Sequence, residues 1–281
     1  MAIRRTLTKI GRALLPEALK RPLRRRIQQG APMPMNLDFG LVEDNGSFHA
    51  YLPAGERIVI PPAIVVEFRS NFENDWDEMK SFLEVAKNAD VLFDVGADKG
   101  VMAATFAALG ENKKALAYEP STSGCQQMRD LLEQNDLQGQ VEIVAKVVAE
   151  QSGQVAFSQE DCGYVQVVAV ASANEVQAEC VSLDDECERL GYAPDIVKID
   201  VEGYEGEVLR GAEKLLEEKG PIICLELHLA YLEKRGLDPA EILRMLERKG
   251  YSIQSLSGER VSPKEVVDSV RQIVRVVCCK D

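Results

Sequence analysis

The sequence lacks the cysteine pattern of small disulfide-bonded domains, the ligand spacing of zinc sites and the long apolar runs of transmembrane segments. Its seven cysteines include no Cys-x-x-Cys pair, and only two histidines, His49 and His228, could complete a zinc site. No stretch approaches the roughly 18 consecutive apolar residues needed to cross a bilayer. The 281 residues, 46% of them hydrophobic, suffice for one large α/β domain with an extension, or for two small domains. We therefore expect a cytoplasmic protein with reduced thiols and no zinc.

Beyond the N-terminus, acidic residues outnumber basic ones, 45 to 24. The net formal charge is −13, yet residues 1–30 hold nine Lys or Arg residues against a single acid, Glu17. Four apolar residues of this arm recur at helical spacing: Ile3, Leu7, Ile10 and Leu14. Two interpretations of the basic amphipathic arm stay open, a solvated tail and a peripheral contact of residues 1–26 with an anionic membrane surface or partner. The acidic remainder argues against an extensive nucleic-acid surface.

The rest of the chain divides into a short connecting region and one larger domain. Residues 31–70 are predicted as a linker and a β-rich cap or edge, and residues 71–281 as the catalytic domain. In the domain, apolar runs typical of buried strands alternate with helical patterns, and extra strands are expected around residues 154–182. The strand-like runs are 91–96, 115–118, 141–148, 196–199 and 222–227. This alternation predicts an α/β fold with a mostly parallel sheet and helices on both faces.

A glycine-containing turn, Asp94-Val95-Gly96-Ala97-Asp98-Lys99-Gly100, follows the first strand of this domain. Glycine lets the backbone approach a ligand closely, and the next helix offers free N–H groups. The dinucleotide fingerprint would have a middle glycine where Asp98 stands, and the acids of the turn would repel a pyrophosphate. S-adenosylmethionine, with its cationic sulfonium and ammonium, suits the turn better than NAD. A tight turn with no ligand is the alternative.

Glu119 ends the next strand and is a candidate to bind ribose. One carboxylate can accept hydrogen bonds from both ribose hydroxyls, and open α/β sheets bind ligands at the carboxyl ends of their strands. Pro120 stops the strand directly afterwards. The alternative is an exposed acid at a strand end.

Ionisable residues gather after two further strands. Lys198, Asp200, Glu202 and Glu205 follow one another at the end of a buried strand, where such groups are costly unless they are paired or used. The alternative is that Lys198 pairs structurally with an acid and that the glutamates favour a helix N-terminus. The following helix is expected to continue to Gly220.

The strand of residues 222–229 adds a second candidate pair. Glu226 and His228 alternate with Leu227, so both should lie on one face of that strand. Histidine titrates near neutrality and can act as a base, although a lone histidine at a strand end is more often structural. Because Asp200, Glu202, Glu226 and His228 show no diagnostic ligand spacing, no metal is expected.

Taken in order, these segments resemble the FkbM family of S-adenosylmethionine-dependent methyltransferases. The resemblance covers roughly residues 70–256, and its most specific part is the Lys-Ile-Asp-x-Glu-Gly-x-Glu run that begins at Lys198. The segments are residues 94–100, 118–120, 181–184 and 197–205. The resemblance implies a Rossmann-like class I methyltransferase fold, with Asp94, Gly96, Ala97, Asp98 and Gly100 around the methionine end of S-adenosylmethionine and Glu119 on its ribose. The sequence departs from the family at Asp98, where asparagine is common.

Methyl transfer to an alcohol needs alignment of donor and acceptor and removal of one proton. Asp200 is the first candidate for the base, Glu202, Glu205 and His228 are alternatives, and Lys198 could stabilise the developing oxyanion. We expect an O-methyltransferase acting on a hydroxyl of a small molecule, a sugar, a glycan or a secondary metabolite. Two alternatives stay open: N-methylation of protein or nucleic acid, and a non-catalytic S-adenosylmethionine-binding module recruited through the basic arm.

Overall fold

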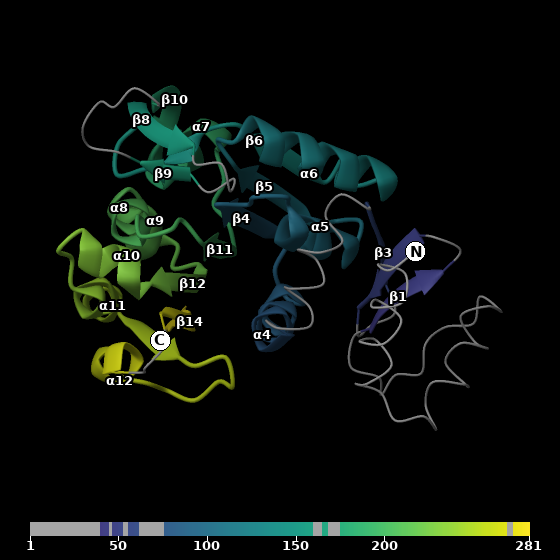
Figure 1. The fold of residues 1–281 in the computed structure, drawn as a ribbon. Coiled ribbons are helices and arrows are strands. Elements are labelled where there is room, and N and C mark those ends of the chain that lie inside the picture. Colours follow the sequence, from purple (N-terminus) through teal and green to yellow (C-terminus); the bar gives the residue numbers. More distant parts are fainter. Residues whose placement is uncertain are drawn as a thin grey trace, which may run out of the picture.

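The computed structural model describes residues 40–44, 47–52, 56–61, 76–159, 165–167, 175–268 and 272–281 (Figure 1). The predicted basic arm lies outside these residues, and so does part of the predicted linker region. In the described part of that region, three antiparallel strands form a small sheet in the order β1-β2-β3. Their bounds are β1 Gly40–Asp44, β2 Ser47–Tyr51 and β3 Arg57–Ile60.

A seven-stranded sheet in the order β13-β14-β12-β11-β4-β5-β6 forms the centre of the molecule. All neighbouring pairs from β12 to β6 are parallel, and only β14 runs antiparallel to both of its neighbours. The mostly parallel sheet predicted from the sequence is therefore confirmed. The strands are β4 Val91–Val95, β5 Lys114–Tyr118, β6 Val141–Val144, β11 Ile196–Ile199, β12 Ile222–His228, β13 Tyr251–Gln254 and β14 Ile273–Lys280.

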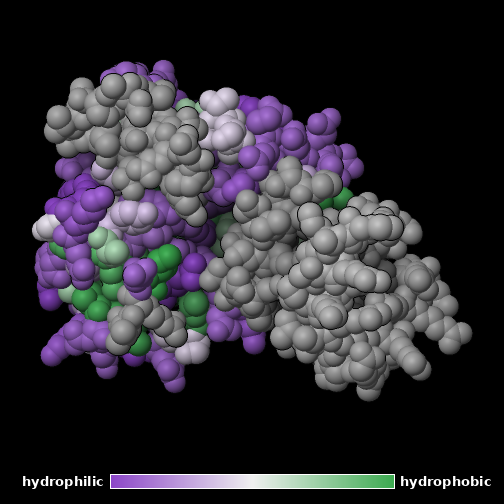
Figure 2. All heavy atoms as spheres, in the orientation of Figure 1, coloured by the Kyte–Doolittle hydropathy of each residue, from purple (hydrophilic) through white to green (hydrophobic). Residues whose placement is uncertain are grey.

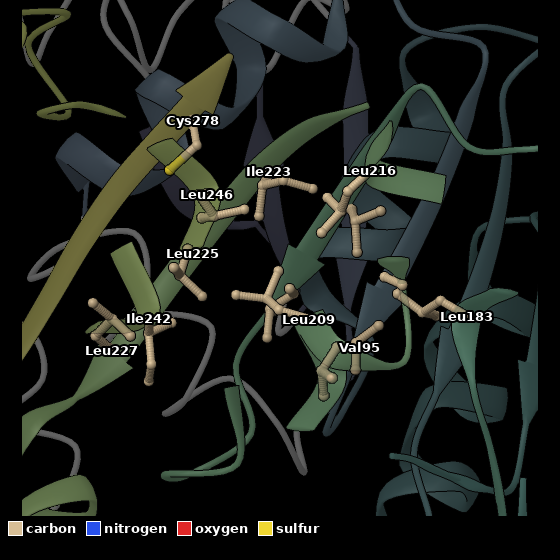
Figure 3. Packing of buried hydrophobic residues seen from close by; sticks show 14 of the residues in the cluster. Val95, Leu183, Leu209, Leu216, Ile223, Leu225, Leu227, Ile242, Leu246 and Cys278 are labelled. Atoms are coloured by element: carbon tan, nitrogen blue, oxygen red, sulfur yellow. The ribbon is translucent and has the colours of Figure 1, made fainter. Parts of the chain in front are cut away.

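Helices cover both faces of this sheet (Figure 1). The helices α4 Trp76–Ala86, α5 Val101–Ala108 and α6 Thr122–Gln134 pack with β3 over one face, in a core that contains Phe82, Phe106 and Met128. The other core contains buried residues from the remaining helices, among them Leu209, Leu216 and Ile242 (Figure 3). These helices are α7 Leu183–Leu190, α8 Glu205–Arg210, α9 Glu213–Glu218, α10 Leu229–Lys234, α11 Pro239–Arg248 and α12 Pro263–Asp268.

Side chains alternate between these two cores along the central strands, because successive residues of a strand point to opposite faces. In β12, Ile223, Leu225 and Leu227 belong to the core formed with α8 and α11. Glu226 and His228 therefore point to the opposite face, the one covered by α4 and α5. The sequence pattern predicted this shared orientation.

Two predictions about element boundaries were wrong. The run 141–148 is not one strand: β6 ends at Val144, and β7 (Val147–Val148) joins a separate four-stranded sheet beside β10. The helix expected to continue to Gly220 is broken into α8 and α9 around Gly211. A Cβ at Gly211 would lie 2.2 Å from the carbonyl oxygen of Ala149, so no side chain fits at this position. The helix breaks here because Asp184 takes both partners of the helical hydrogen bond: its N–H donates to the carbonyl of Gly211 (2.9 Å), and its carboxylate accepts from the N–H of Leu215 (2.8 Å).

The four-stranded sheet, in the order β7-β10-β8-β9, contains the extra strands expected near residues 154–182. They are β8 Gly153–Gln159, β9 Val165–Val167 and β10 Glu175–Val181. Most of the residues coloured in Figure 2 are hydrophilic, and the hydrophobic ones gather around α10–α12. In the part of the chain that the structure describes, no helix combines the length and the apolar character that a membrane span requires.

Candidate active site

The predicted site residues come together where the direction of the strand order reverses. From β4 the chain adds β5 and β6 on one side and later adds β11 and β12 on the other, so the reversal lies between β4 and β11. Ligands of open α/β sheets bind beyond the carboxyl ends of the strands at this point. The backbone N–H of Asp200 donates to the carbonyl of Val95 (3.0 Å), which ties the end of β11 to the glycine turn after β4.

Gly96 is the closest point of contact between these two segments. Its φ of 79° lies in the left-handed region, and a Cβ there would lie only 1.8 Å from the carbonyl oxygen of Asp200. Ala97 anchors the turn on its other side, because its N–H donates to the carbonyl of Tyr118 (3.0 Å) at the end of β5. The turn is thereby held by both neighbours of β4.

Asp98 takes a left-handed backbone conformation, with a φ of 46°. Its side chain is 62% exposed and pairs with Lys99 at 2.8 Å, while its backbone N–H donates to Glu119 Oε2 at 2.9 Å. Aspartate and asparagine are the residues other than glycine that adopt this conformation most readily. The departure from the family at this position thus preserves the backbone and changes the charge.

Asp94 lies beneath the turn. Its side chain is only 1% exposed, and Oδ2 accepts a hydrogen bond from the backbone N–H of Ala103 in α5 (3.1 Å). Burial raises the pKa of Asp94 to about 6, against the opposing effect of the nearby Lys198 charge. Asp94 therefore connects β4 to the helix that follows the turn.

Glu119, the predicted ribose ligand, lies beside the turn and is 6% exposed. Each carboxylate oxygen accepts one backbone hydrogen bond, Oε2 from Asp98 (2.9 Å) and Oε1 from Ser121 (2.7 Å). Burial raises the pKa of Glu119 to about 7, and the charge of Asp98 adds to this effect. Because a carboxylate oxygen accepts up to two hydrogen bonds, both oxygens can still accept from a ligand.

Lys198 lies buried at the floor of the site. Its ammonium is 3.1 Å from Asp200 Oδ2 and 3.8 Å from Glu78 Oε1 of α4. Burial acts to lower the pKa of Lys198, but the charges of Asp200 and Glu78 outweigh it and raise that pKa. The structural pairing considered for Lys198 therefore exists, and it involves one acid that the sequence analysis did not nominate.

Arg275 of β14 is the second cation of the site and was also missed. Its Nε is 2.9 Å from Glu78 Oε2 and 2.8 Å from Glu226 Oε2, so Glu78 joins Lys198 to Arg275. Arg275 could have been noticed as a charged residue within the apolar run of residues 273–277. Nothing in the local sequence distinguishes Glu78 from the other acids of α4.

His228, at the end of β12, is almost fully buried among carboxylates. Its Nδ1 donates to Glu205 Oε1 (2.9 Å). Its Nε2 faces three carboxylate oxygens, which are Glu202 Oε2 at 3.4 Å, Glu226 Oε1 at 3.6 Å and Asp200 Oδ1 at 3.7 Å. Burial acts to lower the pKa of His228, but the hydrogen bond that His228 donates to Glu205 and the surrounding negative charges raise it to about 9.

The carboxylates around His228 differ in their electrostatic surroundings. Burial acts to raise the pKa of Asp200, yet the charges of Lys198 and His228 hold it below its usual range. Burial and the charge of Asp200 raise the pKa of Glu226 to about 7, and burial also raises the pKa of Glu202. The side chains of Asp200 and Glu202 are the most open of this group, at 30% and 20% exposed.

Glu202 is held in place by a strained turn. Its φ is 52°, an uncommon conformation for a residue other than glycine. Arg235, which directly follows α10, donates to the carbonyl of Gly203, the residue after Glu202. Its guanidinium lies 3.8 Å from the centre of the Tyr204 ring. These contacts fix the turn that carries Glu202 toward His228.

Ligand atoms of Asp200, Glu226 and His228 all lie within 4.8 Å of one another, close enough to hold one metal ion. The sequence analysis predicted no metal because these residues lack a diagnostic spacing along the chain. They come instead from two neighbouring strands, β11 and β12, whose register pairs Ile199 with Leu225.

The strand order, the single antiparallel strand β14 and the acids at the strand ends define a class I methyltransferase, an enzyme that uses S-adenosylmethionine. A family model described as the methyltransferase FkbM domain matches residues 94–253. Because this match covers more than half of the chain, the protein belongs to the FkbM methyltransferase family. Both the fold and the family predicted from the sequence are confirmed.

Comparisons with individual proteins found a similar curated protein and similar solved structures. The chain is 27% identical over 188 residues to the hexuronic acid methyltransferase AglP of Haloferax volcanii, an alignment that covers 66% of this chain and 72% of the relative. A crystal structure of methyltransferase FkbM from Methylobacillus flagellatus KT has a TM-score of 0.44 and 19% identity, covering 68% of this chain but 43% of that chain. A precorrin-6y C5,15-methyltransferase from Geobacter metallireducens GS-15 has a TM-score of 0.41 and 18% identity, covering 73% and 87%.

Proposed function

We propose that the protein transfers the methyl group of S-adenosylmethionine to a hydroxyl oxygen of a sugar or glycan. The observation that carries this proposal is the direct contact of the glycine turn at Gly96 with Asp200. A donor held at the turn would have its reacting carbon beside the carboxylates of Asp200 and Glu202. The similarity to a hexuronic acid methyltransferase supports a carbohydrate acceptor.

The residues around the turn suit S-adenosylmethionine. This cofactor supplies an electrophilic methyl group on a cationic sulfonium. Among the described residues, five carboxylates near the turn face three side chains that can be cationic, Lys198, Arg275 and His228. The carboxylates are those of Glu78, Asp200, Glu202, Glu205 and Glu226. The excess negative charge attracts a cationic ligand. Gly96, Ala97, Asp98 and Gly100 would bind its methionine end, and Glu119 would accept hydrogen bonds from its ribose.

The acceptor hydroxyl must lose its proton as its oxygen attacks the methyl carbon, and the carbon–sulfur electron pair stays on sulfur. Asp200 and Glu202 are the carboxylates placed to take this proton, because their side chains are the most accessible of the cluster. Lys198 contacts Asp200 from below and fixes its orientation. The four residues assigned to catalysis from the sequence, Lys198, Asp200, Glu202 and His228, thus lie within one ionic cluster.

Two measurements test this function. Calorimetric titration should show binding of S-adenosylmethionine and S-adenosylhomocysteine but not of NAD. Incubation with methyl-labelled S-adenosylmethionine and a set of sugars and oligosaccharides that contain hexuronic acids should transfer label to oxygen. Label on nitrogen of added protein or nucleic acid, or binding of NAD alone, would contradict the proposal.

The pKa of Glu119 leads to a prediction about pH. Because this pKa is about 7 in the folded protein and the ribose hydroxyls prefer the ionised carboxylate, affinity for S-adenosylmethionine should rise by up to roughly tenfold from pH 6 to pH 8. Stability should change in the opposite sense. A carboxyl whose pKa is raised on folding binds more protons in the folded state, so the stability it contributes falls as pH rises from about 4.5 to 7.

Glu119→Gln is the variant that isolates this effect. It should bind the cofactor more weakly at pH 8 and lose most of the pH dependence, as measured by calorimetry at both pH values. Glu142→Gln, on the exposed side of β6, removes a carboxylate away from the turn and should retain the wild-type profile. An unchanged profile in Glu119→Gln would assign the dependence to another group.

A further inference from the structure

We propose that Asp200, Glu226 and His228 bind one divalent cation that takes both carboxylate and imidazole ligands. The first argument is the geometry of the three ligand atoms. His228 Nε2 lies 3.6 Å from Glu226 Oε1 and 3.7 Å from Asp200 Oδ1, and the three atoms fall within 4.8 Å of one another. Two ligands about 2.1 Å from a common ion lie about 3.0 Å apart at an octahedral angle and about 3.4 Å apart at a tetrahedral angle. Both separations from His228 exceed these values by less than about 1 Å.

The second argument is that His228 presents an unused nitrogen to the cluster. Its side chain is 4% exposed, and Nδ1 is already engaged by Glu205 Oε1 at 2.9 Å. Among the residues that the structure describes, no hydrogen bond reaches Nε2. Histidines that bind metals characteristically hold the second ring nitrogen against a carboxylate, which fixes the tautomer and the ring orientation. Glu205 therefore has the place of an outer-shell partner.

The third argument is that both carboxylate ligands are oriented from outside. Lys198 contacts Oδ2 of Asp200, which leaves Oδ1 on the side of His228. Arg275 donates to both oxygens of Glu226, and Oε1 also faces His228. Outer cations that hold ligating carboxylates in place are a regular feature of metal sites. Even with Lys198 and Arg275 present, the surrounding carboxylates outnumber the cations.

The ligand chemistry indicates the class of ion. Magnesium and calcium prefer oxygen ligands alone, whereas one imidazole with two carboxylates suits a first-row ion such as Mn²⁺. This part of the inference rests on the proposed function: a cation at this site would bind the acceptor oxygen and make its proton more acidic. With Asp200 serving as a ligand, the proton passes to Glu202, whose Oε2 lies 3.4 Å from His228 Nε2.

Electron paramagnetic resonance of the purified full chain titrated with MnCl₂ tests the site directly. The signal of free Mn²⁺ should be lost up to one ion per chain. His228→Gln and Glu226→Gln should each weaken binding at least tenfold, and Glu205→Gln should weaken it 10- to 100-fold through the outer shell. Glu241→Gln, which removes an exposed carboxylate on α11, should bind Mn²⁺ as the wild type does. Circular dichroism establishes which variants are folded, and Asp200→Asn, at the more open end of the cluster, replaces any that are not.

Two results would overturn the inference. One is wild-type protein that is folded yet binds no Mn²⁺ at millimolar concentration, and the other is His228→Gln binding as tightly as the wild type. Calorimetry with S-adenosylmethionine on the same metal-free sample separates this inference from the proposed function. A protein that binds the cofactor and transfers methyl groups in the presence of a chelator, and that binds no Mn²⁺, would refute the cation site. The methyltransferase assignment would be unaffected. Mn²⁺ binding without binding of S-adenosylmethionine would support the cation site and contradict the proposed function.

Discussion

Asp200→Asn should lower kcat for methyl transfer by about 10²- to 10⁴-fold, while the Kd for S-adenosylmethionine stays within about threefold of the wild type. The carboxamide keeps the shape of the side chain but loses the charge that pairs with Lys198 and faces His228. It can neither accept the acceptor's proton nor serve as an anionic ligand. In the proposed site the donor is bound mainly by the turn and by Glu119, which the substitution does not touch, and the other four carboxylates remain to attract its positive charge.

Single-turnover kinetics with labelled donor, combined with calorimetry, separate chemistry from binding in this variant. Asp130→Asn provides the matched control, because Asp130 is an exposed aspartate on α6 whose side chain contacts only Gln126 within the described residues. Full turnover in Asp200→Asn would show that the acceptor's proton leaves by another route. A loss of cofactor binding equal to the loss of rate would assign Asp200 to the donor site instead.

Gly96→Ala should destabilise the protein by about 2–5 kcal/mol. An alanine in the left-handed conformation costs roughly 1–2 kcal/mol, and overpacking a dense site typically adds 1–3 kcal/mol. The Cβ would lie 1.8 Å from the carbonyl oxygen of Asp200, which is backbone and can move only if the end of β11 moves with it. The substitution should therefore also separate the cofactor turn from the acceptor site and reduce kcat/KM.

Urea unfolding monitored by circular dichroism measures the change in stability of Gly96→Ala. Gly139→Ala is the matched control, since a Cβ at Gly139 would meet nothing within 4 Å and its φ is not in the left-handed region. That variant should unfold within about 0.5 kcal/mol of the wild type. Equal midpoints for the two variants would mean that the turn and the end of β11 are not packed as the structure has them.

The sequence predicted the central strands and the acids that follow them because those signals are local. Apolar runs such as that of β4 and β11 are recognisable without knowing what covers them, and the acids follow directly where each strand ends. The split of residues 141–148 between two sheets and the break at Gly211 were missed. Both depend on where the chain meets another segment, such as the Ala149 carbonyl beside Gly211, and no local pattern records that contact.

The residues of the site also divide into those that the sequence predicted and those that only the structure revealed. Lys198, Asp200, Glu202 and His228 were predicted because they stand at strand ends, but Glu78 and Arg275 were not. These two residues lie on α4 and β14, on either side of the matched family segment. Glu78 contacts Lys198 of β11 and Arg275 contacts Glu226 of the neighbouring strand β12, which brings Glu78 Oε2 within 2.9 Å of Arg275 Nε.

By itself the sequence determined the fold class, the family and the identity of the strand-end acids, because alternation of apolar residues and the glycine turn are properties of short segments. Only the tertiary structure decided which of those acids face one another. Asp200 and Glu226 are distant in the chain, yet neighbouring strands of a sheet lie about 4.8 Å apart, and the parallel register of β11 and β12 brings their carboxylates to the same imidazole.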